Sequence, residues 1–329
     1  MIDKPETQLR FAIVGCGLIG RKRLNSLNPG QLAVACDVAI ERAEALTTLA
    51  GHGRATADFV DAVTDPAVDA VVVATLNNLL APIARKAITA GKHVLVEKPM
   101  ALDPYGADRM MNAARRYKRV LMTAQVLRFF PEYMALHQAI SGGQLGRFRF
   151  ATFRRRCAAP AWGGWLQDPE KSGGGVFDLL IHDVDMCLLL FGKPKAVCAS
   201  GYSDAALGID CMDAQLFYDD GLAQITGGWH NAGEFPFSME YCVTLDGGTV
   251  EYSSLGRPPT LFGAKGGSQL LELKPSDGYA AEIDYFAGCC DNAQFPDRCP
   301  PADSADAVKL MRLMLESRQR NGAKMICTL

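Results

Sequence analysis

Four ionisable side chains interrupt one of the most apolar stretches of the chain. The run 176–191 is otherwise hydrophobic, yet it contains Asp178, His182, Asp183 and Asp185. In a helix, residues 178, 182 and 185 follow the i, i+4, i+7 spacing and share one face. Burying such groups is costly unless partners or a ligand satisfy them. A histidine near a carboxylate is suited to acid–base chemistry, because imidazole takes up and releases protons near pH 7.

Two other interpretations of this polar stripe stay open. Asp178 and His182 can form a satisfied core pair, or the aspartates and histidine can ligate a metal ion. No further His or Cys cluster with ligand spacing accompanies the stripe, so the sequence predicts no metal site. The remaining histidines have no acid–base partner visible in the sequence and are interpreted as structural (His52, His93, His137 and His230).

A second chemical signature lies near the N-terminus, where Gly15 to Gly20 spell G-x-G-x-x-G. The apolar run before it predicts a buried strand, and the run 31–36 predicts the next strand, which ends at Asp37. A carboxylate at this offset can accept hydrogen bonds from an adenosine ribose, so the unit predicts dinucleotide binding. The alternative is that the glycines serve only a tight turn. Asp37 favours NAD over NADP, because it occupies the place of a 2′-phosphate; Arg42, one turn into the next helix, is the reservation.

The elements that position these residues follow two different patterns along the chain. Up to residue 125, strands expected over 69–75, 92–96 and 120–125 alternate with helices over 41–50, 77–90 and 103–117. This alternation predicts a parallel sheet with helices on both faces. Ligands bind at the carboxyl ends of such strands, so we expect Thr75, Glu97, Lys98 and Gln125 to lie near the cofactor.

After Gln125 the pattern changes, which divides the chain into domains 1–125 and 126–329. Strand-like runs joined by tight turns predict an antiparallel or mixed sheet (147–157, 195–203, 210–218, 221–230, 237–245 and 249–252). Helices are expected over 284–293 and 304–320, and the helix 304–320 is a candidate to pack back on the first domain. Several of the strands carry apolar residues on both alternating sets, which predicts a sheet covered on both faces and hence a homodimer or homotetramer.

Three motifs in this order resemble the glucose-fructose oxidoreductase, inositol dehydrogenase and MocA (Gfo/Idh/MocA) family. They are the glycine loop, the Glu-Lys-Pro run within 91–99, and the Gly-Gly-Gly-x-x-Asp-x-x-x-His-Asp-x-Asp run at 173–185. The resemblance implies an NAD(P)-dependent oxidoreductase. Its expected α/β fold is an N-terminal Rossmann doubly wound sheet followed by an α+β domain with a large, mostly antiparallel open sheet that forms the oligomer interface. The family's catalytic lysine matches Lys98, and its Asp-x-x-x-His pair matches Asp178 and His182.

The expected reaction moves a hydride between a nicotinamide and a secondary alcohol of a sugar, cyclitol or sugar derivative. His182 would act as the general acid/base, Lys98 would stabilise the alkoxide, and Asp178 would orient the imidazole or hold a hydroxyl. The alternative is a non-catalytic NAD(P)-binding regulatory protein of the same fold. The cofactor-binding candidates are the residues of the glycine loop, the distal acid and the strand ends: Gly15, Gly17, Leu18, Ile19, Gly20, Asp37, Thr75, Asn77, Glu97 and Gln125.

One departure from the family pattern concerns the residues after Thr75. The family's Thr-Pro-Asn-x-x-His run has Leu76 and Leu80 here in place of the proline and the histidine. We therefore expect the contacts near the nicotinamide to differ in detail.

The substrate is the least determined feature. The segment 154–171 is expected to be a loop at the mouth of the substrate pocket, and its Trp162 and Trp165 would suit a sugar ring, although packing within a loop or an interface is an equal alternative. Arg128 and Arg154 are candidates to bind a substrate carboxylate or phosphate, with ion pairs as the alternative.

Composition limits the remaining function classes. The 329 residues have a net charge of −2, which gives no electrostatic footprint for nucleic acid or a membrane surface. No signal peptide and no membrane-length apolar run is visible, so we expect a cytoplasmic protein. The 11 cysteines are scattered without C-x-x-C spacing and are interpreted as reduced thiols.

Overall fold

The computed structural model describes residues 9–160, 164–204 and 206–329, and it separates into two compact units. The first unit runs to Val126 and also includes Asp277–Ala302, whereas the second contains Leu127–Ser276 and Asp303–Leu329. The sequence placed 277–302 in the second domain. In the structure this segment packs on the first unit, because Phe286 contacts Phe11 with ring centroids 6.4 Å apart.

The first unit is built on a parallel sheet with the strand order β3-β2-β1-β4-β5-β6. This is the order of a doubly wound nucleotide-binding sheet, which confirms the predicted fold class. All four residues of the central strand β1 are buried on both faces, as expected for a sheet between two layers of helices. The strands are β1 (Phe11–Val14), β2 (Leu32–Cys36), β3 (Arg54–Thr56), β4 (Ala70–Val73), β5 (His93–Glu97) and β6 (Leu121–Ala124).

Three helices of this unit, α3, α5 and α9, begin at an aspartate whose side chain caps the first turn. Asp103 accepts a hydrogen bond from the Gly106 amide at 2.8 Å, and Pro104 occupies the first turn, so the predicted cap of α5 is confirmed. The helices are α1 (Leu18–Asn25), α2 (Ile40–Ala50), α3 (Phe59–Thr64), α4 (Asn77–Thr89), α5 (Pro104–Tyr117) and α9 (Gly278–Asp291).

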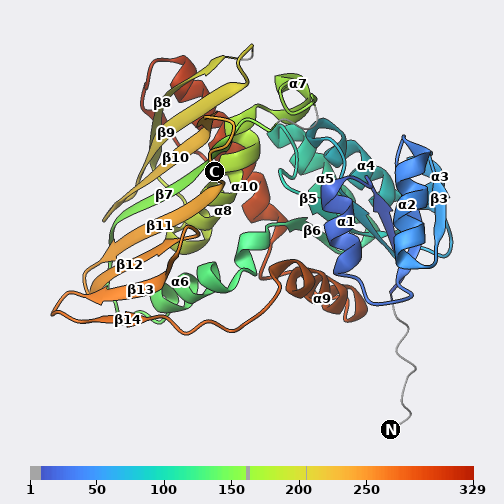
Figure 1. The fold of residues 1–329 in the computed structure, drawn as a ribbon, viewed down its shortest axis with the longest axis horizontal. Coiled ribbons are helices and arrows are strands. Elements are labelled where there is room, and N and C mark those ends of the chain that lie inside the picture. The colour runs from blue at the N-terminus through green and yellow to red at the C-terminus, as the bar shows by residue number, and fades with distance from the viewer. Residues whose placement is uncertain (1–8, 161–163, 205) are drawn as a thin grey trace, which may run out of the picture. The chain divides into compact units, whose positions relative to one another are not determined.

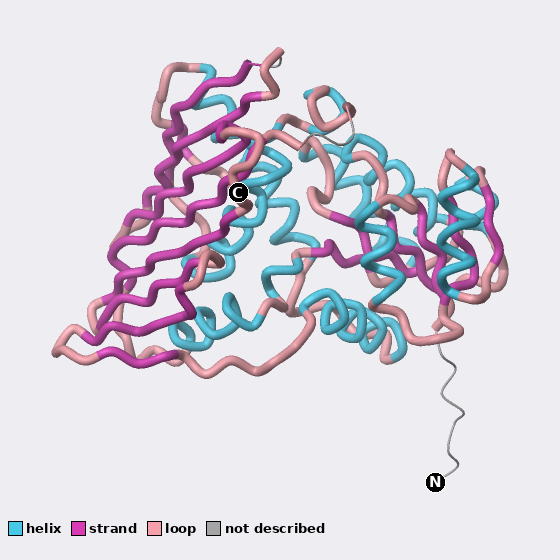
Figure 2. The backbone as a smooth tube through the Cα atoms, in the orientation of Figure 1, coloured by secondary structure: helices cyan, strands magenta, loops and turns pink. Residues whose placement is uncertain are grey.

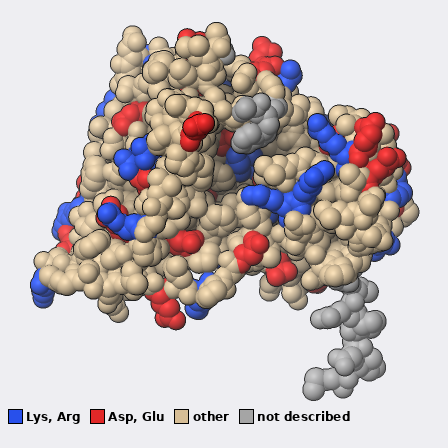
Figure 3. All heavy atoms as spheres, viewed as in Figure 1, with Lys and Arg blue, Asp and Glu red and all other residues tan. Residues whose placement is uncertain are grey.

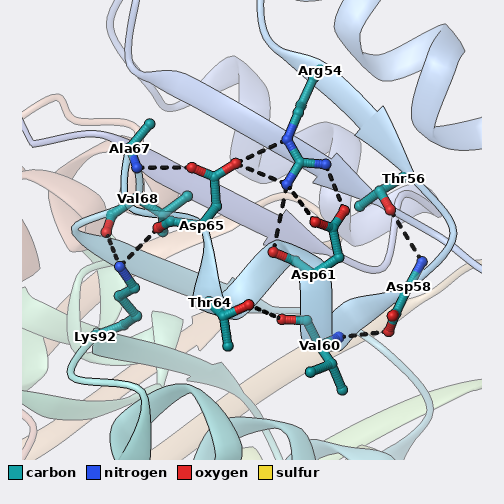
Figure 4. A network of polar contacts seen from close by, with 10 residues as sticks. All are labelled: Arg54, Thr56, Asp58, Val60, Asp61, Thr64, Asp65, Ala67, Val68 and Lys92. Atoms are coloured by element: carbon teal, nitrogen blue, oxygen red, sulfur yellow. Dashed lines mark hydrogen bonds and ion pairs between the residues drawn. The ribbon is translucent and has the colours of Figure 1, made fainter.

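Strand β3 and helix α3 were not predicted, because both are too short for a periodic pattern. Polar contacts hold them in place (Figure 4). Arg54 donates from Nη1 to Asp61 Oδ2 at 2.6 Å and from Nε to Asp65 Oδ2 at 2.8 Å. Lys92, just before β5, donates to the carbonyl oxygens of Asp65 and Val68 at 2.8 and 2.7 Å.

The second unit contains a nine-stranded sheet with the order β14-β13-β12-β11-β7-β10-β9-β8-β15 (Figure 1). Strands β7 and β10 pair in parallel and the other pairs are antiparallel, so the predicted mixed sheet is confirmed. The strands are β7 (Phe148–Ala158), β8 (Ala196–Asp204), β9 (Ile209–Phe217), β10 (Leu222–Asn231), β11 (Ser238–Leu245), β12 (Gly248–Ser253), β13 (Arg257–Gly263), β14 (Ser268–Leu270) and β15 (Met325–Ile326).

Helices cover one face of this sheet (Figure 2). Phe153 of β7 contacts Phe191 of α8 at 6.4 Å between ring centroids, and Tyr241 of β11 contacts Tyr133 of α6 at 5.4 Å. Ser317 of α10 accepts a hydrogen bond from the Ala199 amide of β8 at 2.8 Å. The helical elements are η1 (Val126–Arg128), α6 (Pro131–Ser141), α7 (Pro169–Ser172), α8 (Gly175–Phe191) and α10 (Pro301–Gln319).

The opposite face of the sheet carries no helix among the described residues of the second unit. Its residues are more polar than the sequence pattern indicated. Thr152, Arg154 and Glu240 lie there beside the exposed rings of Phe150 and Phe262. Apolar residues therefore occupy part of the outward set, not all of it.

In the view of Figure 3, acidic and basic side chains are scattered in small groups over a surface that is mostly uncharged. This agrees with the net charge of −2. Among the described helices, none combines the length and hydropathy that a membrane crossing requires.

Candidate active site

The glycine-rich loop joins β1 to α1, and its three glycines meet different constraints. Gly15 has φ +98°, and a Cβ there would lie 2.3 Å from the Ala74 oxygen. A Cβ on Gly20 would lie 2.0 Å from the Gly15 oxygen, so α1 approaches the loop closely. A Cβ on Gly17 would meet nothing within 4 Å, which leaves the backbone open at the start of α1. This combination fits a pyrophosphate at the helix N-terminus.

Asp37 connects the loop to the end of β2. Its Oδ2 accepts from the Cys16 amide at 2.9 Å, and its Oδ1 accepts from the Ala39 amide at 3.0 Å. The carboxylate is therefore fixed beside the glycine loop, where a ribose diol can reach it. Leu18 is exposed and Ile19 is half-buried at the same edge, while Arg42 is exposed on α2.

The other cofactor candidates follow the carboxyl ends of β4 and β6. Thr75 is half-buried, and Asn77 is a buried first residue of α4. Gln125 is 1% exposed, and its Oε1 has no hydrogen-bond partner among the described residues. A buried acceptor of this kind is expected to find a partner, so it fits a site that a cofactor completes.

Lys98 is half-buried directly after β5, next to a buried ion-pair cluster. Arg23 of α1 donates to Glu97 at 2.7 Å and to Glu282 of α9 at 2.6 Å, and its side chain is fully buried. Burial by itself would lower the pKa of the Arg23 guanidinium, but the Glu97 and Glu282 carboxylates raise it above its ordinary value. Sequence reasoning missed Arg23 and Glu282, because only the packing of α9 on the first unit brings the three groups together.

The four ionisable groups of α8 divide into two classes. Arg155 donates hydrogen bonds from Nε and Nη2 to Asp183 at 2.8 and 2.9 Å. Arg128 donates from Nε and Nη2 to Asp185 at 2.8 Å each. All four of these side chains are at most 2% exposed. Asp185 thus shares a helical face with His182 but is neutralised in the core.

Asp178 and His182 form the second class, one helical turn apart and both half-buried. Burial raises the pKa of the nearby Cys157 thiol to about 11, and the Asp178 carboxylate adds to the rise. The catalytic candidates are therefore the accessible ionisable groups of α8. Among the described residues, no group of three or more His, Cys, Asp or Glu side chains is arranged to hold a metal ion.

The substrate candidates are distributed over different environments. Arg128 is occupied by Asp185 and also contacts Asp303 at 3.1 Å, which favours the ion-pair interpretation. Arg154 pairs with Glu240 on the sheet face opposite α8, since its neighbour Phe153 faces the helix. Trp165 is half-buried, whereas Trp162 lies outside the described residues. The predicted loop 154–171 is strand β7 up to Ala158 and includes the short helix α7.

Two further positions clarify the sequence analysis. Leu80, at the family's histidine position, is fully buried in α4, and Leu76 is the half-buried N-cap of that helix. His93 has a structural contact, because its Nδ1 accepts from the Val120 amide at 3.0 Å. Burial and Arg119 lower the pKa of His93, which favours the neutral ring that this contact requires.

Comparison with known families decides the identity of the two units. The model described as "Oxidoreductase family, NAD-binding Rossmann fold" matches residues 9–125, and the GFO/IDH/MocA C-terminal domain matches residues 133–251. The chain belongs to the Gfo/Idh/MocA family. It is accordingly an NAD(P)-binding oxidoreductase, as the three motifs predicted.

Individual relatives agree over most of the chain. The 1,5-anhydro-D-fructose reductase of Ensifer adhaerens is 29% identical over 297 residues, covering 84% of this chain and 86% of that protein. The scyllo-inositol 2-dehydrogenase (NADP(+)) IolU of Bacillus subtilis (strain 168) is 29% identical over 326 residues, covering 94% and 89%. A levoglucosan dehydrogenase in complex with NADH shares the fold with a TM-score of 0.86 at 19% identity, covering 97% and 98%.

Proposed function

We propose that this protein is a dehydrogenase or reductase for a secondary alcohol or ketone of a sugar, cyclitol or sugar derivative. The observation that carries the proposal is the difference in burial along α8. Asp183 and Asp185 are fully buried in ion pairs with arginines, whereas Asp178 and His182 are half-buried, so a ligand can reach them. The names of two relatives, 1,5-anhydro-D-fructose reductase and scyllo-inositol 2-dehydrogenase, support this substrate class.

Each candidate has a separate role in alcohol oxidation. His182 accepts the hydroxyl proton, because neutral imidazole is a base near pH 7. The Lys98 ammonium stabilises the alkoxide that develops on the same oxygen. Asp178 orients the imidazole or holds a neighbouring hydroxyl. A bound nicotinamide cofactor supplies the hydride chemistry.

The residues that would hold this cofactor are the glycine loop, Asp37 and the polar groups at the strand ends. We propose NAD as the preferred form, since Asp37 is fixed where a 2′-phosphate would meet its negative charge. Relatives are named with both cofactors, IolU with NADP and levoglucosan dehydrogenase with NADH, so the preference rests on Asp37.

The test is nicotinamide absorbance with a panel of polyols, aldoses and sugar acids, each run with NAD and with NADP. We expect turnover of at least one cyclitol or sugar with NAD. The alternative, a regulatory protein that retains the fold, predicts cofactor binding with turnover of none of them. Binding measured in parallel by NADH fluorescence separates a regulator from a misfolded preparation.

A further inference from the structure

We propose that Asp210, Trp229 and Arg318 form a clamp that sets the position of Asp178 and His182. The clamp residues come from β9, β10 and α10, and all of their contacts described here lie within the second unit. They are positioning residues, because they act through α8 and not on a substrate. The inference rests on the proposed function of α8.

Helix α8 begins without a side-chain cap of its own. Its N-cap is Gly174, and the Val176 amide donates instead to Asp210 Oδ2 of β9 at 3.0 Å. Arg318 Nη1 donates to Asp210 Oδ1 at 2.7 Å and to the Cys211 oxygen at 3.1 Å. One carboxylate thus connects the start of α8 to the end of α10. A negative charge at this end of the helix is also favourable to the helix dipole.

Close packing completes the clamp. A Cβ on Gly174, which has φ +94°, would lie 2.9 Å from Asp210 Oδ2. A Cβ on Gly175 would lie 2.5 Å from Cε3 of Trp229, whose side chain is almost fully buried. The glycine run before α8 is therefore required by contacts with β9 and β10. Any larger residue would displace the first turn of the helix.

The first turn is connected directly to the candidate residues. The Asp178 amide donates to the Gly174 oxygen at 3.0 Å, and His182 follows one turn later. Since an α-helix is rigid over two turns, displacement at Gly174 displaces both side chains. The buried pairs of Asp183 and Asp185 hold the next turn of the helix, so loss of the clamp should tilt α8 without releasing it.

The experiment compares Asp210→Ala with Ser317→Ala in the full-length protein. Ser317 is a matched control, because it is fully buried beside Arg318 on α10 and bonds β8 instead of α8. The readouts are the Tm, kcat and KM, and the imidazole NMR signals of His182. The chain has five histidines, and a His182→Gln variant assigns the signal.

We expect Asp210→Ala to shift the His182 signals and to lower kcat by about 10- to 100-fold, the scale of a 1 Å misplacement. Asp210→Asn should restore part of the loss, since its side-chain oxygen can still accept from Val176. Ser317→Ala should lower Tm without either change. NADH affinity should stay constant in all variants, because the cofactor candidates lie in the other unit.

The inference is overturned if Asp210→Ala leaves the His182 signals and kcat at the values of the Ser317→Ala control. If Asp210→Ala does not fold, Arg318→Met, which removes the hydrogen bond to Asp210, decides by the same criteria. If the wild-type protein turns over no substrate, the proposed function fails, whereas the NMR signals of His182 still support or overturn the clamp.

Discussion

His182 and Asp178 remain half-buried on α8, while the two aspartates near them are neutralised in the core. The sequence showed four ionisable groups in an apolar helix, but it could not show which of them form buried ion pairs and which stay half-buried. Their partners, Arg128 and Arg155, are 57 and 28 residues away from the aspartates in the chain. Spacing within one helix identifies a polar face, whereas the ion pairs depend on the packing of other elements.

Removing one member of a buried pair should destabilise the fold. Arg155→Met leaves Asp183 buried without its guanidinium, so we expect a loss of about 3–5 kcal/mol in the free energy of unfolding. Asp61→Asn is the control, because the Arg54–Asp61 pair has side chains 41% and 48% exposed. Urea denaturation of both variants measures the difference. Equal stability of the two variants would contradict the role given to Arg155.

The cofactor preference depends on one carboxylate. Asp37→Ser removes the negative charge at the place of a 2′-phosphate and weakens the hold on the ribose. We expect the Kd for NADH to rise and the ratio of NADPH to NADH affinity to move towards one, as measured by fluorescence titration. Tighter binding of NADPH by the wild-type protein would contradict the preference for NAD and make Arg42 the next candidate to test.

At the scale of elements, two substitutions in the glycine loop distinguish a cofactor-binding role from a purely structural one. Gly17→Ala should fold normally, since a Cβ there meets nothing within 4 Å. Its methyl group should obstruct the cofactor and raise the Kd for NADH by about 10-fold, equivalent to about 1.4 kcal/mol. Gly20→Ala should instead destabilise the protein by about 1–3 kcal/mol, because its Cβ would meet the Gly15 oxygen. Unchanged NADH affinity in Gly17→Ala would favour the tight-turn interpretation.

The elements predicted well were those with strong local signals. Asp103 and Pro104 define the start of α5, and the Asp37 strand and glycine turn appear at the expected residues. Strand β3, with three residues, and helix α3, with six, were not predicted, because segments this short show no clear hydrophobic period. The cap of α8 could not be predicted for another reason. Its acceptor, Asp210, lies on strand β9, 34 residues away from Val176 in the chain.

At the scale of the molecule, the return of segment 277–302 to the first unit could not be predicted. Its helix has the same apolar pattern as any other, and its place is set by Phe286 against Phe11 and Glu282 against Arg23. Helix α10 was considered a candidate to pack on the first domain. The structure shows it bonded to its own unit's sheet through Ser317 and Arg318.

Assembly is the prediction that belongs to this scale. The uncovered face of the nine-stranded sheet exposes Phe150, Tyr202, Phe262 and Leu270 by 42–69%. Large apolar side chains exposed on a sheet face are candidates for burial against another chain. We expect a homodimer or homotetramer formed through this face, and light scattering at micromolar concentration measures it. A mass of 35.5 kDa, that of one chain, would rule the assembly out.

The most direct test of the proposed mechanism is the pH profile of kcat for alcohol oxidation in the wild-type protein and in His182→Ala. Oxidation by the wild type should fall as pH drops through the pKa of the base, because protonated imidazole cannot accept the hydroxyl proton. His182→Ala should lose about 10²- to 10⁴-fold in kcat and lose this acid limb, while NADH affinity stays unchanged. A variant with near-normal kcat and the same acid limb would contradict the account and make Lys98 the candidate base.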